Sequence, residues 1–245
     1  MKKDYFGEEV AASYDGGPMF SAEVLDPTVE FLAALALEGC ALEFGIGTGR
    51  VALPLAARGV RVHGIDLSEA MVAKLREKPG AERVGCTIGD FATTRIDDLF
   101  SLVYLVFNTI GNLTTQDEQV ACFQNAAAHL EPGGCFVIEV VVPDLQRLAP
   151  GERFYPFDVS GDHLGFDEYD VANQGLVSHH FWPEDGGWQR SSTPFRYVWP
   201  AELDLMARLA GMRLRERWED WDRSPFTGES RKHVSVWERP AASRT

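Results

Sequence analysis

The sequence is poor in cysteine, and its cysteines are not paired. Only four occur in 245 residues, and no Cys-x-x-Cys pair is present. Most of them lie in or beside segments expected to be core strands, where a free thiol behaves as a small apolar side chain. The three histidines between Pro143 and Trp199 also lack metal-ligand spacing. The sequence therefore predicts no metal site and structural roles for Cys40, Cys86, Cys122 and Cys135.

Long apolar runs are missing as well. The run from Leu99 to Phe107 has the length of a strand, far below the roughly 20 residues that a membrane-spanning helix needs. The start of the chain, Met1 to Tyr5, is charged and has no apolar stretch behind it, so it does not resemble a secretory signal. We therefore expect a cytoplasmic protein with no membrane partner.

Positive charge is scarce: the formal net charge is −14. A surface this acidic repels phosphate backbones, and the arginines between Arg208 and Arg217 are interleaved with glutamates rather than gathered into a basic patch. Nucleic acid is therefore not expected as a partner. The remaining expectation is a small-molecule partner for a monomer or homodimer.

What the sequence does contain is an alternation of short apolar runs and helical patterns from about residue 40, typical of βαβ units and a parallel sheet. Ser68 and Thr115 are placed as helix N-caps, and glycine or proline follows the helices. The expected strands are 40–44, 60–66, 83–88, 100–107 and 135–142, and the expected helices are 22–37, 49–58, 68–78 and 115–130.

The pattern changes after Pro143. From there to Trp199 glycine, proline and aromatic residues are dense and no helix is continuous. Residues 175–183 and 187–197 indicate an antiparallel hairpin around the turn 184–187. A helix over 201–210 and strands over 213–221 and 233–237 follow. The segment before residue 22, which contains Tyr14 and Asp15, is expected to be irregular.

The turn after the first expected strand reads Glu43-Phe44-Gly45-Ile46-Gly47-Thr48-Gly49-Arg50. Glycines at this point let the backbone pass close to a ligand at the carboxyl edge of a sheet. The dinucleotide fingerprint is GxGxxG, but here Arg50 stands at the position of its last glycine. The spacing therefore favours a ligand without a pyrophosphate.

Two carboxylates follow the next two strands. Asp66 is placed to accept hydrogen bonds from both hydroxyls of a ribose, although it also has the alternative role of capping the next helix. Asp90 is placed to accept from the exocyclic amine of an adenine, with Leu67 and Phe91 on either side of the ring.

Together with Leu130-Glu131-Pro132-Gly133-Gly134, these motifs resemble the class I methyltransferases that depend on S-adenosylmethionine (SAM), and more loosely the enzymes that N-methylate amino sugars. The resemblance covers residues 40–142. It implies an α/β, Rossmann-like seven-stranded sheet of order 3-2-1-4-5-7-6 with strand 7 antiparallel. It also implies that Glu43 faces the methionyl amino group, that Gly45, Gly47 and Gly49 pass along the cofactor, and that Tyr14 and Arg50 are candidates for the methionyl carboxylate.

The same resemblance divides the chain into an amino-terminal lid and helix (1–39), a SAM-binding domain (40–142 and 200–245) and an antiparallel insert after strand 5 (143–199). The loop with Phe107 and Asn108 follows the fourth strand, where this family borders the transferred methyl group. The aromatic insert is expected to bind the acceptor, with His180, His179 and Tyr169 as candidate catalytic residues. Ordinary sheet packing and edge histidines remain the alternative reading of these residues.

The expected function is SAM-dependent transfer of a methyl group to a nitrogen, oxygen or carbon atom of a small molecule, for which a natural-product intermediate is one candidate. Two alternatives stay open. One is a nucleotide-dependent oxidoreductase on a Rossmann sheet, which the position of Arg50 disfavours. The other is a non-catalytic SAM-binding protein, against which the presence of Glu43, Asp66 and Asp90 argues.

Overall fold

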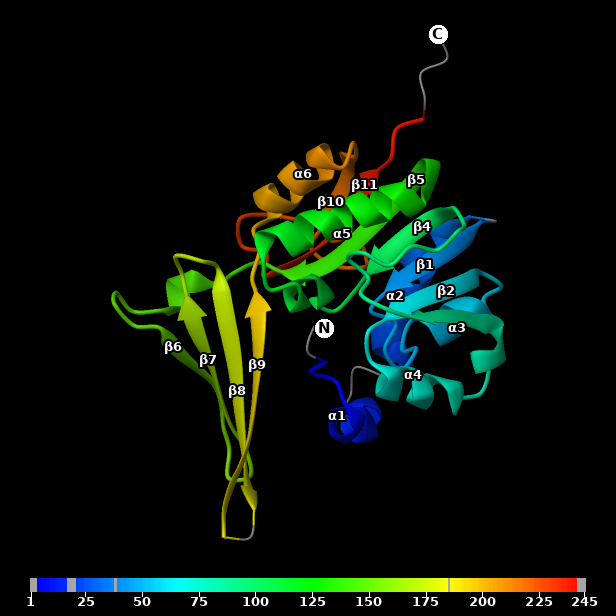
Figure 1. Cartoon of the computed structure of the whole chain (residues 1–245). Helices are drawn as coiled ribbons and strands as arrows, with labels where there is room; N and C mark the ends of the chain where they lie inside the picture. Colours follow the sequence, from blue (N-terminus) through cyan, green and yellow to red (C-terminus); the bar gives the residue numbers. More distant parts are fainter. Residues whose placement is uncertain (1–3, 17–20, 38, 185, 242–245) are drawn as a thin grey trace.

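One seven-stranded sheet forms the main body of the molecule (Figure 1). The computed structural model describes residues 4–16, 21–37, 39–184 and 186–241. The strand order is β10-β11-β5-β4-β1-β2-β3, and neighbours are parallel except that β11 is antiparallel to both β5 and β10. β11 therefore takes place seven and β10 place six, so the predicted Rossmann-like order is confirmed. The strands are β1 Cys40–Phe44, β2 Arg61–Asp66, β3 Val84–Ile88, β4 Phe100–Leu105, β5 Leu130–Val141, β10 Arg213–Trp218 and β11 Lys232–Glu238.

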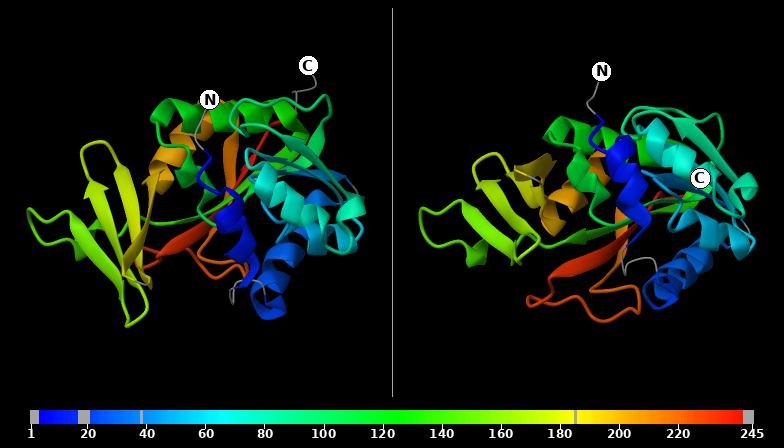
Figure 2. Two further views of the ribbon diagram at one scale, coloured as in Figure 1. Left: turned by 60° about the horizontal axis from the view of Figure 1, so that its bottom comes forward. Right: turned by 90° about the horizontal axis from the view of Figure 1, so that it is seen from below.

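Helices cover both faces of this sheet (Figure 2). On one face α5 and α6 contribute Phe123 and Leu203 to a buried cluster with Trp237. On the other face α2 and α3 contribute Phe31 and Leu55 to a second cluster. Every residue of β1 between these layers is buried. The α-helices are α1 Glu8–Ser13, α2 Ala22–Ala36, α3 Ala52–Ala57, α4 Glu69–Arg76, α5 Gln116–His129 and α6 Pro200–Leu209; the 3-10 turns are η1 Tyr14–Gly16, η3 Ala81–Arg83, η4 Thr109–Asn112 and η5 Leu145–Arg147.

The two predicted helix caps are confirmed. The Ser68 hydroxyl accepts a hydrogen bond from the Met71 amide at 3.3 Å and so begins α4. Thr115 forms a capping box with Glu118: its hydroxyl accepts from the Glu118 amide at 3.2 Å, and its own amide donates to the Glu118 carboxylate at 3.0 Å. Each cap starts its helix directly after a loop at the carboxyl edge of the sheet. None of the helices in the described ranges is both long and apolar enough to cross a bilayer.

The insert forms a second, four-stranded sheet of order β6-β7-β8-β9 that projects from the main body (Figure 1). All its neighbouring strands are antiparallel. The predicted hairpin corresponds to β8 and β9, whereas β6 and β7 were not predicted as strands. Asp185, in the predicted turn, lies outside the described residues. The strands are β6 Phe154–Val159, β7 Leu164–Asp170, β8 Gly175–Glu184 and β9 Gly187–Arg196.

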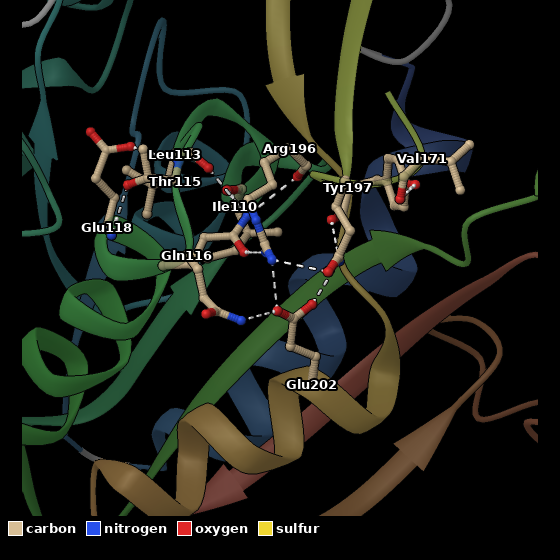
Figure 3. A network of polar contacts seen from close by, with 11 residues as sticks. Ile110, Leu113, Thr115, Gln116, Glu118, Val171, Arg196, Tyr197 and Glu202 are labelled. Carbon is tan, nitrogen blue, oxygen red and sulfur yellow. Dashed lines mark hydrogen bonds and ion pairs between the residues drawn. The ribbon is translucent and has the colours of Figure 1, made fainter. Parts of the chain in front are cut away.

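A buried arginine fastens the insert to the main body (Figure 3). Arg196, 5% exposed at the end of β9, donates to the Glu202 carboxylate of α6 at 2.7 Å and to the Gln119 side chain of α5. Gln174 donates to the same glutamate at 2.8 Å, and so does Gln116. Although burial alone would raise the pKa of Glu202, these donors hold it below its ordinary value.

The segment before α2 is helical over α1 and η1, so the prediction of an irregular segment was wrong. Asp15 of η1 forms an ion pair with Lys78 at 2.6 Å and accepts from the Thr48 hydroxyl at 2.6 Å. Gln189 of β9 donates to Glu9 of α1 at 2.5 Å. The amino-terminal segment therefore lies over the carboxyl edge of the main sheet and reaches the insert (Figure 2).

Candidate active site

The glycine-rich turn after β1 has a backbone that only glycine adopts readily. Gly45, Gly47 and Gly49 have φ angles of +73°, +53° and +79°. A Cβ atom added at Gly45 would lie 2.7 Å from the Thr109 methyl carbon, and one added at Gly49 would lie 2.9 Å from a methyl carbon of Leu75. The first and second glycines line a cavity, while the third lets the chain pack against α4.

Asp66 at the end of β2 fixes this turn. One carboxylate oxygen accepts from the Gly47 amide at 2.6 Å and the other from the Ser68 amide at 2.9 Å. Burial raises the pKa of Asp66, and these two hydrogen bonds oppose the rise. Because a carboxylate has about four lone-pair sites, each oxygen still has room for a hydroxyl donor. Asp66 thus holds the N-cap residue of α4, Ser68, and does not itself cap the helix, and its contact with a ribose stays a prediction.

A cavity of about 300 Å³ adjoins Asp66. Asp90 and Phe91, which follow β3, contribute to its wall, as does Leu67. The Phe91 ring is stacked on Phe44 with centroids 5.7 Å apart, which fixes its orientation. We call this the first cavity. Of the predicted cofactor residues it is lined by Tyr14, Gly45, Gly47, Asp66, Leu67, Asp90 and Phe91.

Residues that were not predicted also line the first cavity. Asp4, Tyr5 and Phe6 come from the amino-terminal segment, and Pro194 comes from β9. The amino-terminal residues are held there because the Ser68 hydroxyl donates to the Phe6 carbonyl oxygen at 2.7 Å. The sequence carried no motif for these positions, since their place depends on how two distant segments fold back on the sheet edge.

Glu43 lies beneath the glycine turn and is 2% exposed. Its carboxyl group accepts from the Tyr104 hydroxyl at 2.9 Å, and burial raises its pKa to about 8. Glu43 does not belong to the described lining of the first cavity. A protonated carboxyl at this depth is ready to lose its proton when a cation comes near, because a nearby positive charge favours the charged form.

A second cavity of about 480 Å³ lies between α2, the carboxyl ends of β4 and β5, and the start of β11. Three predicted cofactor residues line this cavity rather than the first: Arg50, Phe107 and Asn108. The Arg50 guanidinium lies 4.8 Å from the centre of the Phe107 ring. Arg50 also acts on Tyr14, since its charge partly opposes the burial that raises the Tyr14 pKa.

Two consecutive residues of the wall between the cavities have strained backbones. Phe107 and Asn108 have φ angles of 55° and 60°, which cost free energy for residues other than glycine. Glu139 of β5 holds them: its carboxylate accepts from the Phe107 amide at 3.0 Å, and its carbonyl accepts from the Asn108 amide at 3.2 Å. The Asn108 side chain in turn accepts from the Val141 amide at 2.7 Å.

Sequence reasoning missed Glu139, although a signal was present. It is the one charged residue in the apolar run from Cys135 to Val142. A charge near the carboxyl end of a buried parallel strand is costly unless it is partnered or functional. The sequence therefore indicated that Glu139 has a partner or a function, although it lies outside the motifs of the family resemblance.

The catalytic candidates of the insert already contact other side chains of the insert. His179, 6% exposed, has its ring nitrogens 2.8 Å from the Ser192 hydroxyl and 3.3 Å from Glu168. His180 contacts His163 at 3.0 Å and the Ser178 hydroxyl at 3.3 Å, and burial lowers its pKa. Burial raises the pKa of Tyr169 to about 12. None of the three is among the described residues that line either cavity.

Comparison with known proteins shows the family of this chain. A family model described as a methyltransferase domain matches residues 41–134. The structure of the CcbJ methyltransferase from Streptomyces caelestis is 40% identical with a TM-score of 0.87, and the match covers 99% of this chain and 100% of that chain. The chain belongs to the SAM-dependent methyltransferases.

This methyltransferase is also similar to the cypemycin N-terminal methyltransferase of a Streptomyces species, with 29% identity over 203 residues, 81% of this chain and 82% of the relative. It shares its fold with SAM-bound CalS10, described as an amino pentose methyltransferase from Micromonospora echinaspora, at 23% identity and a TM-score of 0.69 over 98% of this chain and 99% of that chain. The cofactor is therefore SAM, and neither an oxidoreductase nor a non-catalytic protein finds support.

The first cavity fits the adenosine part of SAM. Asp66 is placed for hydroxyl donors, Asp90 is an acceptor at the neighbouring strand end, and Phe91 supplies a ring face. Gly45 and Gly47 present only backbone atoms to this cavity. The volume lies at the small end of the range for ligand pockets, which suits a nucleoside.

Proposed function

We propose that this protein methylates an amino nitrogen of a small molecule, with SAM bound in the first cavity and the acceptor in the second. The observation that carries the proposal is the loop shared by the two cavities. Thr109 lines the first cavity, whereas its neighbours Phe107 and Asn108 line the second. A methyl donor in one cavity and an acceptor in the other would meet at this loop.

The choice of nitrogen rests on the relatives. The cypemycin enzyme is described as an N-terminal methyltransferase, and a relative from Streptomyces venezuelae, 38% identical over 77 residues, is described as an N,N-dimethyltransferase of an amino sugar nucleotide. The acidic surface of this chain, with its net charge of −14, also favours cationic acceptors over anionic ones.

The cofactor residues have separate tasks in this proposal. Asp66 binds the ribose, Asp90 and Phe91 bind the adenine, and Glu43 faces the methionyl amino group. Arg50 and Tyr14, close enough to influence each other's charge, bind the methionyl carboxylate. When bound, SAM would supply the methyl group: an amine that arrives protonated first gives up a proton to solvent water, its freed lone pair then forms the new N–C bond, and the bond from the methyl group to sulfur breaks with both electrons leaving on sulfur.

The protein's own contribution is positioning and the exclusion of water. We assign residues 1–39 as a lid, residues 40–142 and 200–245 as the SAM-binding domain, and residues 143–199 as a cap on the acceptor side. Val141, the last residue of β5, lines the second cavity just before the cap begins, whereas the cap itself contributes Pro194 of β9 to the first cavity.

A turnover assay tests the function. The purified protein is incubated with SAM and matched amines and alcohols, and both S-adenosylhomocysteine (SAH) and the methylated product are measured by mass spectrometry. We expect methylation of amines and none of the matched alcohols. Methylation of the alcohols alone would overturn the assignment to nitrogen.

A further inference from the structure

Glu139 is a half-buried carboxylate in the wall of the second cavity. One of its oxygens, Oε2, accepts from the Phe107 amide at 3.0 Å. In the part of the chain that the structure describes, the other oxygen has no hydrogen-bonding partner. We propose that Glu139 binds the acceptor: the second oxygen holds a protonated or N–H-bearing amine, while the first fixes the loop beside it. This deepens the proposed function and rests on it.

The other carboxylates of the second cavity are less suited to this task. Asp220 forms an ion pair with Lys232 at 2.6 Å, so its charge is largely balanced. One oxygen of Asp222 accepts from both the amide and the hydroxyl of Ser224, at 2.9 and 2.5 Å, and this residue is exposed. Glu23 is exposed in the first turn of α2. Among these four carboxylates, Glu139 is the one that accepts a hydrogen bond from the shared loop, at the Phe107 amide, in the described part of the chain.

The surroundings of Glu139 strengthen a charged contact. Val106, Val141 and Trp221 give the second cavity apolar walls, and a hydrogen bond between charges gains strength where water is scarce. Of the two cations that line the cavity, Lys232 is paired with Asp220 and Arg50 lies against the Phe107 ring. A cationic amine entering this space would find its best partner at Glu139.

The strained loop explains why Glu139 should both bind the amine and hold the loop. Phe107 and Asn108 keep left-handed backbones because Glu139 holds both of their amides through its side chain and its carbonyl group. An amine bound to Glu139 is therefore positioned relative to the loop that separates it from the first cavity. The same carboxylate selects amines over alcohols, because an alcohol brings no positive charge to it.

The experiment measures binding to the protein saturated with SAH, so that no turnover is needed. The probes are 4-fluorobenzylamine and the neutral 4-fluorobenzyl alcohol, followed by fluorine NMR. In Glu139→Gln the amide oxygen can still accept from Phe107, so the loop keeps its tether while the charge is lost. We expect this variant to bind the amine at least about tenfold more weakly and the alcohol unchanged.

Two further variants guard the result. Glu152→Gln removes the same charge from the exposed turn before β6 and should leave amine binding unchanged, and Glu139→Asp should keep a preference for the amine. An unchanged SAH affinity shows that each variant is folded. Equal amine affinities in wild type and Glu139→Gln, or no amine preference in the wild type, would overturn the proposal. Failure of the proposed function would instead appear in the turnover assay, as alcohols methylated in place of amines.

Discussion

The carboxyl edge of the main sheet and the insert hold their polar residues in different ways. At the sheet edge Glu43 is the last residue but one of the buried strand β1, and Asp66 and Asp90 stand at or just after the next two strand ends. Their positions follow from the backbone, because parallel strands all end on the same side. In the insert His179 and His180 lie in the middle of a strand, and their ring nitrogens contact neighbouring side chains. The edge is arranged to receive a ligand, whereas the insert histidines are occupied with holding a single-layer sheet together.

The two regions also differ in how they are attached. The edge belongs to a sheet with a buried cluster on each face. The insert depends on polar contacts at its base, above all those of Arg196 with Glu202 and Gln119 (Figure 3). Changes at the base of the insert should therefore act on stability, and changes at the edge on cofactor binding.

The largest effect is expected for Arg196→Met. It removes the positive charge beside Glu202 and the donor to the Gln119 side-chain oxygen, although Gln116 and Gln174 still donate to Glu202, so the free energy of unfolding should fall by about 3 kcal/mol. Urea denaturation measures this. Arg213→Met is the control, because its pair with Glu238 is exposed and should contribute less than about 1 kcal/mol. Equal losses in the two variants would show that the network does not fasten the insert.

A smaller effect, on cofactor binding alone, is expected for Asp66→Asn. Loss of the charge should weaken SAH binding by roughly 1.5–3 kcal/mol, the range for hydrogen bonds to charged groups, while the amide oxygen still accepts from one backbone amide. Calorimetric titration measures it, with the exposed Asp97→Asn as control. An unchanged dissociation constant would remove Asp66 from the cofactor site.

Burial of Glu43 should make the free energy of unfolding depend on pH. Its folded-state pKa of about 8 lies above the ordinary value of 4.5, so between these values the folded protein keeps a proton that the unfolded chain releases. The free energy of unfolding should therefore fall as the pH rises through this window, by up to about 1.4 kcal/mol per pH unit from this group, and become independent of it above the folded pKa. Glu43→Gln should have a flatter profile in urea denaturation. Parallel profiles would contradict the buried, protonated state.

The smallest effects are expected for the insert histidines. His179→Ala and His180→Ala should change SAH affinity by no more than about twofold, because neither residue lines the described first cavity. Their kcat/KM values should fall by less than about tenfold, since a true general base costs on the order of 10²–10⁴. A fall of about 10²–10⁴-fold in kcat/KM for either variant would identify that histidine as the catalytic base. The insert would then share the chemistry with the sheet edge.

Sequence reasoning reached the residues whose place depends on local signals. Ser68 and Thr115 cap their helices as predicted, because a cap needs only its next three residues. The sequence places the glycine turn directly after β1 and Asp66 at the end of β2, as the structure has them. Strands β6 and β7 were missed: β6 contains Pro156 and has exposed and half-buried residues without clear alternation, so its sequence carries little period-two signal.

The second cavity was beyond sequence reasoning for a different reason. Its walls come from α2, the loop after β4, β5 and the start of β11, which only the folded chain brings together. Phe107 and Asn108 were predicted as cofactor residues, but which cavity they line depends on the direction in which the loop turns, and they line the second. The left-handed backbone that turns it is unusual for Phe107, although asparagine adopts it more readily, and the partner that holds it, Glu139, lies about 30 positions further along the chain.

A crystal structure of the protein with SAH and 4-fluorobenzylamine would test the central claim, that cofactor and acceptor occupy two cavities joined at one loop. The account predicts the adenosine between Asp66 and Asp90 in the first cavity and the amine within hydrogen-bonding distance of Glu139 in the second. An amine bound on the insert beside His180, with Glu139 contacting only the Phe107 amide, would contradict it.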